Sequence, residues 1–92
     1  MSEMNDKQDM VRGNQAQQVL ENPVYQEAYT ALRADIFEKF QKTKFKERDE
    51  RDELWRKLQV VDYIEKRLRQ TMQDGKIAEM TLAQKGKKLI GL

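Results

Sequence analysis

The stretch DERDELWRKLQVVDYIEKRLRQTMQD, residues 49–74, decides the fold, because apolar residues recur in it at a helical period and neither Gly nor Pro interrupts it. At its start Asp49 can cap the helix, and Glu50 and Glu53 place negative charge at the positive end of the helix dipole. Asp74-Gly75 is typical of a helix end, since Gly readily adopts the left-handed conformation found there. The pattern therefore predicts a helix over residues 49–74, with its apolar stripe made of Leu54, Leu58, Val61, Ile64, Leu68 and Met72.

A second amphipathic helix is predicted over residues 23–43. Asn22 is a favourable N-cap, and Pro23 suits the first helical position, where its missing N–H costs nothing. Residues 42–52 then carry alternating charge, which is typical of a solvated turn followed by an exposed helix start. Two neighbouring amphipathic helices with a short connection predict an all-α fold built on an antiparallel αα-hairpin. The apolar stripe of the second helix is Tyr25, Tyr29, Leu32, Ile36 and Phe40.

The sequence divides into three parts: a domain that contains this hairpin, and one segment on each side of it. Residues 1–13 are polar and acidic, and we expect a flexible N-terminal arm there. Residues 14–75 form the expected helical hairpin domain, which begins with a short helix before Pro23. Residues 76–92 are expected to be a partly helical, basic C-terminal tail with Lys85, Lys87 and Lys88.

Composition limits the function. Cys and His are both absent, which removes thiolate metal sites and the commonest general base and metal ligand. We therefore expect no enzymatic activity, no cofactor and no metal site. Apolar runs are far shorter than the ~18 residues of a membrane span, and the polar N-terminus is unlike a signal peptide. The expected protein is intracellular and has no membrane partner.

Self-association is expected because the core must be thin. Of the 92 residues, 38% are hydrophobic and 37% are charged, and one two-helix seam cannot cover all the large apolar groups. Pairing two hairpins into a four-helix bundle would cover them, so we expect a homodimer or a higher homo-oligomer. The predicted core and oligomer-interface residues are Tyr25, Tyr29, Leu32, Ile36, Phe40, Leu54, Trp55, Leu58, Val61, Ile64 and Leu68.

Nucleic-acid binding is the alternative function. The net charge of +2 is close to balance, so it does not indicate a dedicated nucleic-acid coat. Basic residues on the long helix and in the tail could nevertheless contact phosphates, although the plainer interpretation, favoured here, is that they form the outer face of packed helices. The candidate contacts are Arg56, Lys66, Arg67, Arg69, Lys85, Lys87 and Lys88.

Three short stretches resemble a known group of proteins: NPVYQEAY at 22–29, RDELWRKL at 51–58 and DGK at 74–76. Together they are similar to short helical proteins of tailed bacteriophages and prophages that are encoded among head and DNA-packaging genes. The resemblance covers residues 16–80. It implies protein–protein contacts with other phage structural or packaging proteins during head morphogenesis or DNA packaging, in the host cytoplasm or the virion. Its alternative is an accessory factor that binds DNA, such as a small-terminase-like subunit.

Overall fold

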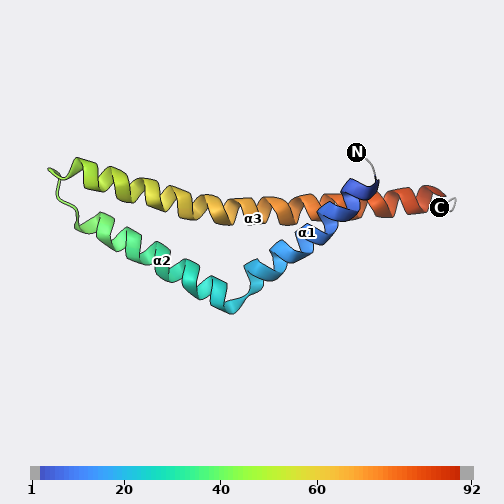
Figure 1. Ribbon diagram of the computed structural model, residues 1–92, viewed down its shortest axis with the longest axis horizontal. Helices are drawn as coiled ribbons and strands as arrows, with labels where there is room; N and C mark the ends of the chain where they lie inside the picture. The colour runs from blue at the N-terminus through green and yellow to red at the C-terminus, as the bar shows by residue number, and fades with distance from the viewer. Residues whose placement is uncertain (1–2, 90–92) are drawn as a thin grey trace. The chain divides into compact units, whose positions relative to one another are not determined.

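The computed structural model describes residues 3–89, and the side chains of residues 5–87. Its elements are three α-helices, α1 (Glu3–Glu21), α2 (Pro23–Lys42) and α3 (Arg48–Leu89), with no strand in this described part (Figure 1). The predicted all-α class is confirmed. Two compact units divide the chain: unit 1 holds residues 3–20 and 67–89, and unit 2 holds residues 21–66. Helix α3 therefore contributes to both units.

Helix α2 begins and ends as its sequence predicts. The Asn22 Oδ1 accepts hydrogen bonds from the backbone N–H groups of Val24 at 2.9 Å and Tyr25 at 3.1 Å, so Asn22 caps the helix. At the other end, the Thr43 hydroxyl donates to the carbonyl of Phe40 at 2.7 Å. The predicted range 23–43 is thus confirmed to within one residue, and α3 starts at Arg48, one residue before the predicted start.

The predicted helix end at Asp74-Gly75 is wrong. Helix α3 runs for 42 residues and passes through Gly75 without a break (Figure 1). In unit 1, Gly75 faces Gly13 of α1, and a Cβ atom on either glycine would lie 2.7 Å from the other's Cα. Gly in a helix interior costs up to about 1 kcal/mol relative to Ala, so this glycine is explained by the close approach of two backbones.

Unit 1 also corrects the expectation of a flexible arm over residues 1–13. Residues 3–13 form the first part of α1, which crosses the later part of α3 (Figure 1). Ala16 and Ala78 are buried three residues after the two facing glycines, and the buried Asp6 carboxylate lies 3.3 Å from the Lys85 Nζ. Small and polar residues make this packing, so no apolar stripe marks it in the sequence. Residues 1–2 of the predicted arm and 90–92 of the predicted tail lie outside the described residues.

In unit 2, α2 packs against residues 48–66 of α3. The buried side chains of this core are Ile36, Leu54, Leu58 and Val61, and Tyr29 and Phe40 are partly buried against them. Contacts at the two ends set the register, because Tyr29 bonds to Asp62 while Phe40 lies under Arg51. Eleven residues forward along α2 thus correspond to eleven residues backward along α3.

Candidate functional site

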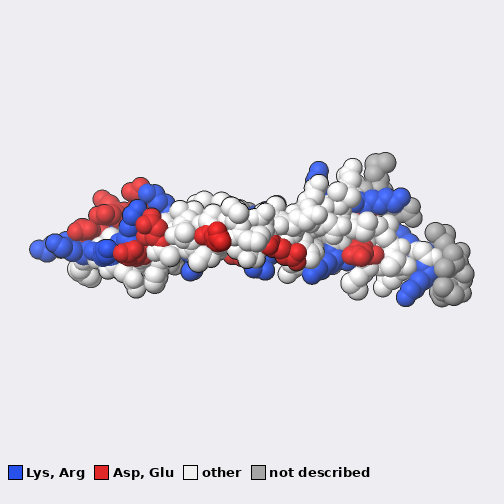
Figure 2. All heavy atoms as spheres, turned by 90° about the horizontal axis from the view of Figure 1, so that it is seen from below, with Lys and Arg blue, Asp and Glu red and all other residues white. Residues whose placement is uncertain are grey.

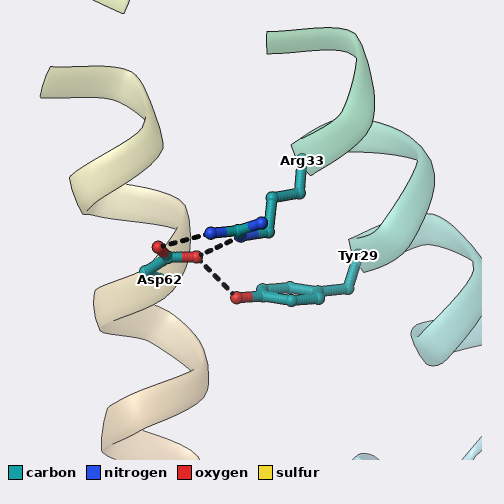
Figure 3. A network of polar contacts seen from close by, with 3 residues as sticks. All are labelled: Tyr29, Arg33 and Asp62. Atoms are coloured by element: carbon teal, nitrogen blue, oxygen red, sulfur yellow. Dashed lines mark hydrogen bonds and ion pairs between the residues drawn. The ribbon is translucent and has the colours of Figure 1, made fainter. Parts of the chain in front are cut away.

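One side of unit 2 is closed by a polar network between its helices (Figure 3). The Tyr29 hydroxyl donates a 2.8 Å hydrogen bond to Oδ1 of Asp62. Arg33 donates to the same carboxylate through Nε at 2.9 Å and Nη2 at 3.4 Å. Asp62 therefore accepts three hydrogen bonds from α2, which hold the two helices together on this side.

The network changes the pKa of each of its members. The hydrogen bonds from Arg33, and then from Tyr29, hold the pKa of Asp62 below its ordinary value. Burial, and the hydrogen bond to Asp62, raise the pKa of Tyr29, because an ionised phenol would face a carboxylate there. The hydrogen bond to Asp62 also raises the pKa of Arg33. All three shifts favour the protonation states present at neutral pH, which is typical of a structural contact and gives none of the groups a proton to exchange near pH 7.

Near the α2–α3 connection, aromatic rings and guanidinium groups meet. Arg51 lies over the Phe40 ring at 5.2 Å, and Arg48 lies over the Phe45 ring at 5.9 Å. A shallow hollow of about 420 Å³ lies among these residues and Trp55. Figure 2 shows that Lys and Arg side chains are mixed with Asp and Glu side chains at this end of unit 2. The mixture does not form a basic patch for phosphates.

The other side of unit 2 is an open groove of about 530 Å³ between α2 and α3. Its apolar part includes the buried core residues Ile36, Leu54 and Val61. Leu32 and Val60 also line it, and they are 50% and 60% exposed. Exposed apolar side chains above a buried apolar floor are the features expected of a protein-binding groove.

Charged residues form the two rims of this groove. On α2, Lys39 pairs with Asp35 at 3.1 Å, and on α3, Lys57 pairs with Glu53 at 3.5 Å. Both pairs are i,i+4 contacts within one helix, and their side chains are more than half exposed. Such pairs stabilise a helix only slightly, so the four charges are available to a second molecule at little cost.

The structure divides the residues predicted for the core and oligomer interface into three groups. Four of them form the buried core of unit 2, and four others are partly buried. Three remain exposed, each at about half of its full area. The buried residues are Ile36, Leu54, Leu58 and Val61. The partly buried residues are Tyr25, Tyr29, Phe40 and Leu68, and the exposed residues are Leu32, Trp55 and Ile64.

The candidate nucleic-acid contacts do not gather into one face within either unit. Arg67 and Arg69 are two positions apart on α3, so they point about 160° from each other. Lys85 is bound to the buried Asp6. Arg56 lines the groove, Lys66 and Lys87 are exposed, and the side chain of Lys88 lies outside the described residues.

No protein-family model, curated protein or solved structure matches this chain. Within residues 3–89, no helix is long and apolar enough to cross a membrane. Over the same described part, no group of three or more acidic side chains could hold a metal ion. The groove is accordingly the feature of unit 2 from which we argue function.

Proposed function

We propose that this chain is a non-enzymatic helical interaction protein whose working surface is the groove between α2 and α3. The observation that carries the proposal is the exposure of Leu32 and Val60 beside a buried apolar floor. Covering such side chains contributes about 25 cal/mol per Å² of apolar area, which favours a protein partner over solvent. The absence of His and Cys supports a role that involves binding rather than catalysis.

In this proposal α2 and the first part of α3 act as an antiparallel αα-hairpin that is completed by another copy of the chain. The supporting observation is the number of large apolar side chains that unit 2 leaves exposed. A soluble monomer commonly tolerates an apolar patch of only a few hundred Å². These exposed side chains are Val24, Leu32, Phe37, Phe45, Trp55, Val60, Tyr63 and Ile64.

The proposed biological setting is head morphogenesis or DNA packaging in a tailed bacteriophage, with other phage structural or packaging proteins as further partners. The resemblance at residues 22–29, 51–58 and 74–76 supports this setting. Gene order tests it independently of any binding experiment. Neighbouring head or packaging genes are expected, and a genomic position without phage genes on either side would contradict the setting.

Light scattering of the wild type and of one groove variant tests the interaction surface. Val60→Glu places a charge on an exposed groove residue, so the chain should keep its helical circular dichroism but lose self-association. Phe37→Glu is the matched control, since Phe37 is also exposed but lies on the side of α2 away from the groove. A wild type that remains at 11.0 kDa at all concentrations would contradict self-association.

A further inference from the structure

We propose that the groove binds a second copy of this chain in one arrangement, in which α2 of each copy lies on α3 of the other, about a two-fold axis that runs along the helices. This inference rests on the proposed self-association and adds the surface, the orientation and the contacts. Its evidence is the order of charged and apolar residues along the two sides of the groove.

The register of unit 2 places those residues level with one another. Tyr29 contacts Asp62 and Phe40 contacts Arg51, which fixes which position of α3 lies opposite each position of α2. By this register, position 35 is level with position 56 and position 39 with position 52. Lys57 and Glu53 are each one residue from those levels, an offset of about 1.5 Å.

Opposite charges therefore face each other in the proposed dimer. A two-fold axis along the groove keeps every level in place while it sets α2 of one copy on α3 of the second copy. Asp35 then meets Lys57 of the second copy, and Lys39 meets Glu53 of the second copy. The symmetry repeats both contacts, so the dimer gains four ion pairs from side chains that are more than half exposed in one chain.

Apolar residues of α2 and α3 also lie at matching levels along the groove. By the same register, Leu32 is level with Val60 to within one residue, so each would cover the other across the dimer. One helical turn further, the small Ala28 is level with the exposed Ile64, again to within one residue. A small residue opposite a large one is the interdigitation that helix packing requires.

The other two-fold arrangement satisfies the charges but not the apolar residues. An axis across the groove would place α2 on α2 and α3 on α3, with Asp35 opposite Lys39 of the second copy. Centred between Asp35 and Lys39, at a level that the register matches to position 54 of α3, it would set Leu32 against Lys42 and Val60 against Arg48. Only the axis along the helices pairs charge with charge and apolar with apolar.

Two variants with exchanged charges test the arrangement. One carries Asp35→Lys with Lys39→Asp on α2, and the other carries Glu53→Lys with Lys57→Glu on α3. Each variant keeps the net charge of the chain and an i,i+4 ion pair within its own helix. In a dimer of either variant alone, however, the four attractive contacts between the copies become four repulsive ones. The dissociation constant of each variant alone should rise at least about tenfold over that of the wild type.

Mixing the two variants distinguishes the interface from the fold. In a mixed dimer, each charged residue on the α2 rim again meets a residue of opposite charge on the α3 rim of the other chain. Association should therefore return to within about threefold of the wild-type affinity. Each chain still holds its own like charges across its own groove, so recovery on mixing cannot come from repaired folding. Sedimentation velocity with a fluorescent label on one variant measures the mixed species directly.

The outcomes separate this inference from the proposed function. A monomeric wild type would contradict both. A wild type that associates, with exchanged variants that associate equally well, would overturn the arrangement alone, because an axis across the groove leaves both exchanges complementary. The matched control is Glu27→Lys with Lys66→Glu, exposed charges away from the groove, which should leave the dissociation constant unchanged.

Discussion

Gly13 of α1 and Gly75 of α3 meet so closely that a Cβ atom added to either would lie 2.7 Å from the other's Cα. Gly75→Ala should therefore push the two helices of unit 1 apart and lower the free energy of unfolding, even though Ala is the better helix former. Thermal unfolding followed by circular dichroism measures the effect.

Gly86→Ala is the matched control for this substitution. Apart from the neighbouring backbone of α3 itself, no atom of the described residues lies within 4 Å of a Cβ placed on Gly86, so Ala there should stabilise α3 by up to about 1 kcal/mol. Equal stabilisation by Gly75→Ala would show that the glycines are not in contact.

Asp62→Asn should destabilise unit 2 at neutral pH, because the carboxylate accepts hydrogen bonds from Tyr29 and Arg33. The pKa of Asp62 is lowered from 3.8 in the folded chain, so the stabilisation is fully present above that value. It is lost as pH falls through the lower pKa of the folded state. Urea unfolding at neutral and acidic pH should show wild type and Asp62→Asn converging in acid; a constant difference would contradict the network.

Leu58→Ala should lower the free energy of unfolding by about 2–4 kcal/mol, because Leu58 is 7% exposed and its removal leaves a cavity. Val60→Ala, two positions away and 60% exposed, should change the stability of a dilute sample by less than about 0.5 kcal/mol. Chemical denaturation of both variants provides the comparison. Similar losses for both would show that Val60 is buried within the single chain.

Trp55, the one tryptophan of the chain, reports on which side of unit 2 associates. It is 51% exposed and lies on the side of α3 away from Glu53 and Lys57. Acrylamide should quench its fluorescence equally in dilute and concentrated samples, because association through the groove leaves it accessible. Protection that grows with protein concentration would place the interface on the other side.

Duplex DNA should bind weakly or not at all in a gel shift at low salt. Lys85 is bound to Asp6, and Arg67 and Arg69 point in different directions, so few basic side chains can contact one phosphate backbone together. A strong shift that weakens steeply with added salt would support the alternative, a nucleic-acid-binding accessory factor.

Most of unit 2 can be predicted from its sequence because local signals determine it. Asn22 and Pro23 mark the start of α2, and the three-and-four spacing of Leu54, Leu58 and Val61 marks the buried face of α3. The polar contact between Arg33 and Asp62 cannot be predicted in the same way. It joins residues 29 positions apart and depends on the register of two packed helices.

Unit 1 is where prediction from the sequence fails. Gly75 after Asp74 has the local pattern of a helix end, yet the helix continues because the glycine faces Gly13 across 62 residues of sequence. Helix α1 packs through Ala16, Gly13 and the buried Asp6, which give no hydrophobic periodicity. Small residues identify such a crossing only when both partners are known.

Sedimentation equilibrium of the wild-type chain, from about 1 to about 200 μM, tests the central claim most directly. The account predicts that the average mass rises from 11.0 kDa toward twice that value as concentration increases. A mass that stays at 11.0 kDa over the whole range would contradict the claim that the groove between α2 and α3 joins two copies of this chain.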